Sequence, residues 1–420
     1  MDSDSVRGIG RRRLVKWSGL TAAGLVAAGV PSMSAATGHA AAPPTGPSEN
    51  DRIPPDTLPG GAYDRYVAKL AAEGKFSGAI LLSHRGRTVL SRSYGMADEE
   101  KGIRNQEGTA FTLSSAGKPF FAVAMLQLAQ RGKLRLTDTV GAHLTGFADD
   151  IADRVNIHHL LSGTSGLDAP DDDVQRVFQS RDEVHEYYER RARQAKLVGV
   201  PGTPNTAHAE PEVTISALIV EAVAGMTYWD YVQENIFKRC GMTGSGFFTR
   251  PQWLTDEHIA HPYMKVADGS VVDALRNLDK GSPNLHVLGK NPGRAFIDAP
   301  GDGGFATAPD LARFAHGLGD GTVLDRPWAD VLTSAKIPHG PASFGAYGIP
   351  ISIVDGQWMY QRAGGNPGVG ANWSIYPDTG WVGVILINRD SDGGSLVDVM
   401  GQEMKAVTGA DPDPDPGSGG

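Results

Sequence analysis

Between Phe120 and Leu128 the chain is almost wholly apolar, and this stretch limits the fold more than any other feature of the sequence. A segment with apolar residues on every face is typical of a helix that is buried on all sides, not of an amphipathic surface helix. Such a helix needs a large core around it. With 420 residues, of which 40% are hydrophobic, the chain can bury one sizeable core or two modest ones.

Strands are expected near both ends of this core-forming region, with helices between them. β-rich runs predict strands over 78–82, 88–91, 372–376 and 381–388. Helical spacing predicts helices over 63–75, 213–223, 228–237 and 395–407. The predicted fold class is α/β, in the α+β sense: an antiparallel sheet built from distant segments and flanked by helices, with a mostly helical region inserted over roughly residues 120–300.

The N-terminus has the pattern of a targeting segment. Residues 11–16 (RRRLVK) match a twin-arginine motif, and an apolar run over 17–30 and an Ala-rich stretch to Ala42 follow. We expect residues 1–42 to be a signal peptide that is removed, which predicts a secreted or extracytoplasmic protein. A membrane anchor is the alternative, but the apolar run is shorter than the roughly 20 residues that span a bilayer, so no stable anchor is expected after removal.

The rest of the chain is predicted to be one catalytic unit over 63–408, because no internal repeat and no second linker interrupts it. A Pro- and Ser-rich flexible linker is expected over 43–62, and a disordered tail rich in Asp, Pro and Gly over 409–420. The net charge of -9 argues against a nucleic-acid partner. Cys240 is the sole cysteine, which excludes an intrachain disulfide and is interpreted as a packing residue.

The candidate chemistry begins at Ser115-Ala116-Gly117-Lys118. If a helix starts here, a spacing of three places the hydroxyl and the amine on one face, about 5–6 Å apart at Cβ. A serine hydroxyl is a weak nucleophile until a base takes its proton, and a lysine can do so only where burial or a nearby positive charge lowers its pKa. Ser115 and Lys118 are therefore predicted to be catalytic, although this spacing alone is a weak signal.

The segments around this motif strengthen the prediction that Ser115 and Lys118 are catalytic. The segments that carry a family pattern occur in the expected order and are 94–95, 111–120, 126–128, 132–134, 157–167, 201–203, 237–242, 303–304, 307–314 and 364–368. Together they resemble class C β-lactamases, penicillin-binding DD-peptidases and family VIII-type esterases, over roughly residues 63–408. The resemblance implies a β-lactamase/transpeptidase-like fold, a loop at 157–167 that walls the active site, and an oxyanion hole formed by the amides of Ser115 and Gly365.

Two motifs depart from the family pattern. The Tyr-x-Asn motif that usually follows Pro-Gly-Thr is replaced by His208-Ala209-Glu210, and the Lys-Thr-Gly or His-x-Gly motif is replaced by Arg362-Ala363-Gly364. His208 can take over proton transfer, because an imidazole titrates near neutrality. Glu210 is expected to face the site and to orient His208 or pair with Arg362, whose planar fork suits a carboxylate. A structural ion network in an inactive site is the alternative for these residues.

These features predict a serine hydrolase that acts on an ester, amide or peptide bond of a small-molecule or peptide substrate through a Ser115 acyl-enzyme. β-Lactam or D-Ala-D-Ala turnover is expected to be weaker than is usual for the family, because the amide-binding motifs have changed. A transacylase with an amine or alcohol acceptor, and a non-catalytic binding protein on the same scaffold, are the alternatives. No cofactor or metal is expected, because no zinc set surrounds His258 and His261. The oligomeric state stays open.

Overall fold

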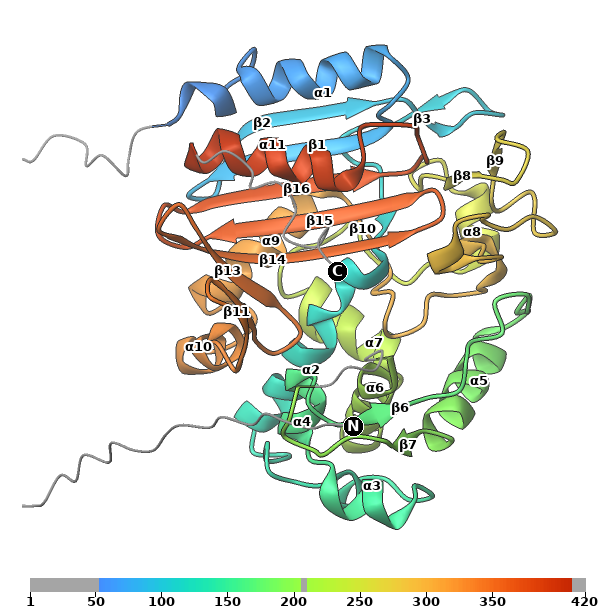
Figure 1. Ribbon diagram of the computed structural model, residues 1–420, viewed down its shortest axis with the longest axis vertical. Helices are drawn as coiled ribbons and strands as arrows, with labels where there is room; N and C mark the ends of the chain where they lie inside the picture. Colours follow the sequence, from blue (N-terminus) through green and yellow to red (C-terminus); the bar gives the residue numbers. More distant parts are fainter. Residues whose placement is uncertain (1–52, 205–209, 410–420) are drawn as a thin grey trace, which may run out of the picture. The chain divides into compact units, whose positions relative to one another are not determined.

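A computed structural model describes residues 53–204 and 210–409. Contacts divide the chain into two units, Met1–Ser48 and Glu49–Gly420, and the described residues all belong to the second. The main element of this unit is an eight-stranded sheet in which neighbouring strands are antiparallel (Figure 1). In spatial order its strands are β11 (Ile337–Gly340), β12 (Ser343–Gly345), β13 (Pro350–Val354), β14 (Gln357–Asn366), β15 (Val369–Tyr376), β16 (Trp381–Ile387), β1 (Gly78–His84) and β2 (Arg87–Tyr94).

The sheet joins the two ends of the described chain. β1 pairs with β16 from Gly78↔Ile387 to His84↔Trp381, so an early strand and the last strand are neighbours, and only β2 lies beyond β1. Every residue of both strands is buried. This arrangement confirms the predicted antiparallel sheet of distant segments.

Helices cover both faces of this sheet. Helices α1 (Ala62–Ala72) and α11 (Leu396–Thr408) pack on one face, while α9 (Ala308–Asp320) packs on the other (Figure 1). Side chains that alternate along a strand point to opposite faces. Ile80 and Leu82 accordingly join the hydrophobic cluster of α1 and α11, whereas Ala79 and Leu81 join the larger cluster that contains α9.

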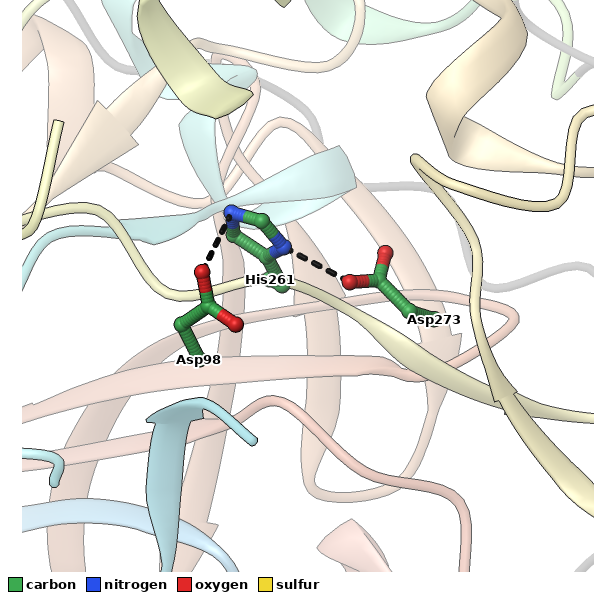
Figure 2. A group of neighbouring side chains, drawn as sticks. All are labelled: Asp98, His261 and Asp273. Carbon is green, nitrogen blue, oxygen red and sulfur yellow. Dashed lines mark hydrogen bonds and ion pairs between the residues drawn. The ribbon is translucent and has the colours of Figure 1, made fainter. Parts of the chain in front are cut away.

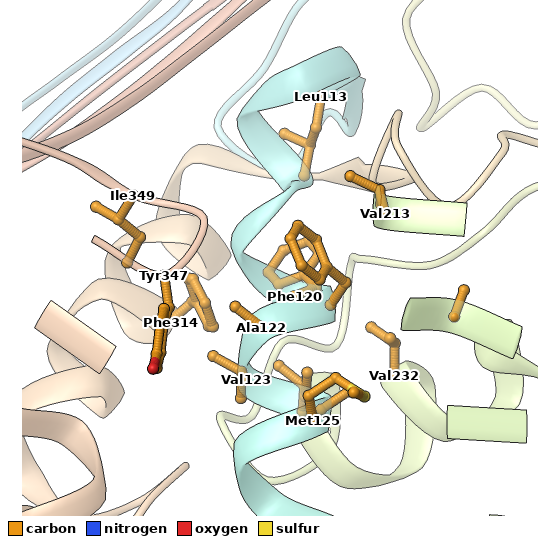
Figure 3. Close-up of a cluster of buried hydrophobic side chains, with 14 of the residues drawn as sticks. Leu113, Phe120, Ala122, Val123, Met125, Val213, Val232, Phe314, Tyr347 and Ile349 are labelled. Atoms are coloured by element: carbon orange, nitrogen blue, oxygen red, sulfur yellow. The ribbon is translucent and has the colours of Figure 1, made fainter. Parts of the chain in front are cut away.

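The apolar run at 120–128 forms the centre of the larger cluster. It lies in α2 (Pro119–Gln130), whose residues from Pro119 to Ala129 are all buried. Figure 3 shows Phe120, Val123 and Met125 of this helix among apolar side chains from other parts of the chain. The prediction of a helix buried on all sides is therefore confirmed, and this helix supports the turn that carries Ser115.

The described chain also has seven further α-helices and four short two-stranded sheets. The helices are α3 (Asp149–Arg154), α4 (Ile157–Ser162), α5 (Arg181–Arg193), α6 (Glu210–Ala224), α7 (Tyr228–Val232), α8 (Arg250–Thr255) and α10 (Arg326–Thr333). The two-stranded sheets pair β3 (Met96–Asp98) with β4 (Ile103–Arg104), β5 (Phe111–Thr112) with β10 (Phe305–Ala306), β6 (Leu167–Asp168) with β7 (Lys196–Leu197), and β8 (Tyr263–Lys265) with β9 (Val271–Asp273). In the described ranges, no helix combines the length and apolar character needed to cross a bilayer.

Two sequence-based expectations need correction. The helix expected to start at Ser115 starts at Pro119 instead, and Ser115 lies in a preceding 3₁₀ turn, Ser114–Gly117. The linker expected over 43–62 is ordered from residue 53, because a 3₁₀ turn at Pro55–Thr57 packs against α11 and buries Thr57 completely. Residues 43–52, and nearly all of the tail expected over 409–420, lie outside the described residues.

Candidate active site

The 3₁₀ turn brings the two predicted catalytic side chains together. Lys118 Nζ donates a hydrogen bond of 2.6 Å to Ser115 Oγ. Residues three apart eclipse one another in a 3₁₀ turn, so the spacing expected for a helix also works here. Both side chains are half-buried, between the top of α2 and the sheet. The hydroxyl and the amine therefore lie close enough to exchange a proton.

The surroundings of Lys118 make it a better base than a free lysine. Burial and, after it, the positive charge of Arg362 lower the pKa of Lys118 to about 8. The carboxylates of Asp302 and Glu210 oppose this shift. At pH 8 about half of the lysine is then a neutral amine that can accept the Ser115 proton.

Arg362 reaches the same turn from the sheet. It lies on β14, and its Nε donates a 2.9 Å hydrogen bond to the backbone carbonyl of Ser115. Burial lowers the pKa of Arg362 to about 10, which still leaves the guanidinium charged at neutral pH. A fixed cation therefore stands beside both Ser115 and Lys118.

Glu210 does not form the expected pair with Arg362. As the first residue of α6, it places its carboxylate 2.9 Å from Nη1 of Arg191 on α5. Its charge still acts on Lys118, so the expectation that it faces the site is compatible with its position. His208 and Ala209 lie outside the described residues, and the role of His208 stays a prediction.

The strand β14 approaches the nucleophile turn closely at its glycines. A Cβ atom on Gly364 would lie 2.3 Å from the backbone nitrogen of Ala116 and 2.6 Å from that of Ser115. Only glycine fits there. Gly365 follows with an exposed backbone, and its carbonyl accepts a 3.0 Å hydrogen bond from Ser114 Oγ. The strand is thus held against the turn where an oxyanion hole is expected.

One pocket borders Lys118, and another lies at the end of β14. The first, of about 180 Å³, is lined by Lys118 and Arg362 together with 160–163 and 345–350. Its wall includes the end of α4, so the segment 157–167 does border the site as the resemblance implied. The other, of about 550 Å³, opens at Gly365 and Asn366 and extends to Lys265. The first pocket therefore offers space for a substrate group beside Lys118.

Sequence reasoning missed several charges at the site. Asp302 and Lys290 both act on the pKa of Lys118, and Asn366 Nδ2 lies 3.5 Å from Asp302 Oδ1. Asp302 directly precedes Gly303-Gly304, a segment of the family pattern, and this position is the only feature of the sequence that could have indicated its place at the site. Glu212 was also missed; it lines the pocket of Lys118 and accepts hydrogen bonds from the backbone and hydroxyl of Ser165. These contacts join segments that are far apart in the chain, so residue spacing in the sequence cannot predict them.

A second cluster of ionisable side chains lies around His261. Figure 2 shows His261 between Asp98 and Asp273, with Nδ1 2.8 Å from an Asp273 oxygen. These three side chains have the donor types of a metal site. However, Arg276 occupies the space between the carboxylates, with Nη2 2.8 Å from Asp98 and Nη1 bonded to Asp273. We therefore interpret the cluster as a buried ion network.

Comparisons with known proteins show the family to which the chain belongs. The Beta-lactamase family model matches residues 63–400. PbpX of Bacillus subtilis (strain 168), named as a penicillin-binding protein, is 25% identical over 315 residues, which cover 73% of this chain and 68% of PbpX. Esterase EstB of Burkholderia gladioli is 40% identical over 109 residues, which are 25% of this chain and 28% of EstB.

A solved structure gives the same result for the fold. The crystal structure of a penicillin binding protein from Bacillus halodurans superposes with a TM-score of 0.67 at 26% identity and covers 80% of this chain and 97% of the other. The family match extends over most of the chain and includes both β14 and the turn at Ser115. We conclude that the chain belongs to the β-lactamase family and has the β-lactamase/transpeptidase-like fold.

Proposed function

We propose that this protein is an exported serine hydrolase that cleaves an ester, amide or peptide bond through an acyl-enzyme on Ser115. The observation that carries the proposal is the 2.6 Å contact between Lys118 Nζ and Ser115 Oγ beside a pocket. A lysine whose pKa is about 8 can remove the serine proton at mildly alkaline pH. The names of PbpX and EstB, a penicillin-binding protein and an esterase, support acyl chemistry of this kind.

The first step forms a bond between Ser115 Oγ and the acyl carbon of the substrate. The proton of Ser115 passes to the neutral amine of Lys118, and the substrate carbonyl oxygen becomes an anion. Collapse of this intermediate expels the leaving group, which takes a proton from Lys118 or His208. Water then attacks the ester on Ser115, and the same groups transfer protons in the opposite direction.

The oxyanion would be stabilised by the backbone N–H groups of Ser115 and Gly365. Two such donors each contribute a few kcal/mol when they are aimed at the developing charge. The close packing of Gly364 against the turn supports this arrangement, because it keeps β14 beside Ser115. Arg362 adds a positive charge on the same side, and its guanidinium would attract an anionic group of the substrate.

Labelling by a fluorophosphonate probe tests the proposal directly. The mature protein is expected to be labelled, Ser115→Ala is expected not to be, and Lys118→Ala is expected to be labelled at least about 100-fold more slowly. Equal labelling of wild type and Ser115→Ala, or labelling of neither, would favour a binding protein on a retired scaffold. The role of His208 is tested by the pH profile of ester turnover, and a neutral titration that persists in His208→Gln would reject it.

Acyl transfer to an amine or alcohol is the second candidate. The pocket of about 550 Å³ at Gly365 favours it, because it offers space for an acceptor beside the residue that is expected to supply an oxyanion donor. Product analysis with an added amine separates the two reactions. A transacylase would give mainly the amide of the added amine, whereas a hydrolase would give mainly the free acid.

Export through a twin-arginine route is also part of the proposal. The residues concerned are Arg11, Arg12 and Arg13, which precede the apolar run of the N-terminus. Replacement of all three by lysine is expected to leave the protein inside cells that otherwise export it. Fractionation of cells and medium, followed by immunodetection, gives the answer.

A further inference from the structure

The residue before the proposed nucleophile has a left-handed backbone. Ser114 has φ 48°, and within the described chain only Arg85 and Asp355 share a positive φ among residues other than glycine. Those two precede Gly86 and Gly356 in the turns of the β1–β2 and β13–β14 hairpins, where left-handed residues are usual. Ser114 lies in no hairpin, and such a conformation persists only where the surroundings hold it.

A hydrogen bond to the sheet holds this residue in place. Ser114 is 2% exposed, and its Oγ donates a 3.0 Å bond to the carbonyl of Gly365 on β14. Trp373 of β15 adds a second contact, since its Nε1 donates a 2.9 Å bond to the carbonyl of Ala116. The left-handed conformation of Ser114 is therefore coupled to the position of the strand that crosses the site.

The contact also indicates where the Gly365 amide points. In an antiparallel strand the N–H and C=O of one residue point to the same side. Because the Gly365 carbonyl accepts a bond from Ser114, its N–H also points to the side of the nucleophile turn and not toward β15. Gly365 is exposed, so this N–H is accessible to a bound group on that side of the strand.

We propose that Ser114 is a positioning residue for the oxyanion hole, and that its hydroxyl sets the Gly365 N–H in line with the N–H of Ser115. The inference rests on the proposed acyl-enzyme function. Without the hydroxyl, the peptide units around Gly365 can rotate, and one donor then misses the oxygen on which charge develops. Such a loss affects the transition state and leaves ground-state binding of the substrate almost unchanged.

The test compares three variants at this position. Ser114→Ala and Ser114→Gly are expected to lower kcat for an ester about 10-fold or more, with KM within about twofold of wild type. Binding of phenylboronic acid, whose tetrahedral adduct on Ser115 places an oxygen in the hole, is expected to weaken in parallel. Ser114→Cys keeps an unbranched side chain of similar size with a weak S–H donor, and it is expected to lose clearly less kcat than Ser114→Ala.

A purely structural role makes a different prediction. If Ser114 only stabilised the fold, kcat would fall together with the melting temperature. Ser114→Gly relieves the left-handed strain, so its melting temperature is expected to stay at or above that of Ser114→Ala, although kcat is expected to be low in both variants. Asp355→Gly is the matched control, because it relieves the same strain in an exposed hairpin turn and is expected to keep full activity.

Wild-type kcat in the Ala or Gly variant, or a loss in the Cys variant as large as in Ala, would overturn the inference. So would losses of kcat that simply follow the melting temperature. Failure of the wild-type protein to react with the fluorophosphonate probe would instead reject the underlying function. The two failures are therefore distinguishable.

Discussion

Arg362 acts on Lys118 through its charge, and this makes the electrostatics of the site testable. After burial, the Arg362 charge is the largest cause that holds the pKa of Lys118 down. Arg362→Gln is therefore expected to raise that pKa, so that the rising limb of ester turnover moves to higher pH by roughly half to one unit. The rate at pH 7 is expected to fall about 3- to 10-fold. The measurement is kcat/KM from pH 6 to 10.

The control for this prediction keeps the charge and removes the planar fork. Arg362→Lys is expected to keep the midpoint of the pH profile near that of wild type, although it loses the guanidinium contact to the Ser115 carbonyl. A profile that stays in place in Arg362→Gln would show that burial alone sets the basicity of Lys118.

At the scale of elements, the contact between β14 and the nucleophile turn leaves no space for a side chain. Gly364→Ala would place Cβ 2.3 Å from the Ala116 nitrogen, so the strand or the turn has to move. We expect a loss of kcat of about 100-fold or more, because a displacement near 1 Å is enough to misalign the reacting groups. Gly340→Ala on β11 is the control, since its Cβ meets nothing within 4 Å. Steady-state kinetics of both variants would decide.

The ion network of Figure 2 joins β3 to the β8–β9 hairpin and predicts a loss of stability in acid. Burial alone would raise the pKa values of Asp98 and Asp273, but Arg276 and His261 bring both below their ordinary values. Carboxylates with depressed pKa values stabilise the fold above about pH 4, and this stabilisation is lost as the pH falls through their folded values. Asp273→Asn is expected to lower the free energy of unfolding by about 3 kcal/mol at pH 7, because it leaves the charges of its partners uncompensated.

Urea unfolding at pH 7 and at pH 3 checks this prediction. The difference in unfolding free energy between wild type and Asp273→Asn is expected to be smaller at pH 3, because the wild-type carboxylate is then partly protonated. Asp256→Asn provides the control, since Asp256 pairs with an exposed His258. This substitution is expected to lower the free energy of unfolding by less than about 1 kcal/mol. Equal costs for the two variants would contradict a stabilising role of the network.

Local patterns predicted the elements well where one physical constraint dominated. The apolar run identified α2, and the β-rich runs identified β1, β2, β15 and β16. The start of α2 was misplaced, although Pro119 at the first helical position is a known signal of a helix start. Of the site, Ser115, Lys118 and Arg362 come together as expected. The Glu210–Arg191 pair and the partners of His261 were missed, because their spacing in the chain carries no information about contact.

At the scale of the whole described unit, one buried carboxyl group links three elements. Glu403 of α11 is 1% exposed, and burial raises its pKa to about 7, with Ser374 and Tyr376 of β15 beside it. Its negative charge also contributes to the raised pKa of Tyr63 on α1. A carboxyl group with a raised folded pKa binds its proton more tightly in the folded state, so stability falls as the pH rises from about 4 to 7.

Glu403→Gln is therefore expected to raise the free energy of unfolding above pH 7, by at most about 3 kcal/mol. Near pH 4 the variant and wild type are expected to be similar, because both side chains are then uncharged. Unfolding free energies measured from pH 4 to 8 test this. A difference that is independent of pH would show that Glu403 does not titrate in the folded protein.

The pairing of β1 with β16 has a consequence for biosynthesis. The ribosome makes the segment with Ser115 early, but β14 and its neighbours leave it only near the end of translation. If Ser115 is the nucleophile as proposed, a partly synthesised chain carries it without β14. Acyl chemistry is then expected only after β14, β15 and β16 have joined β1 in the sheet.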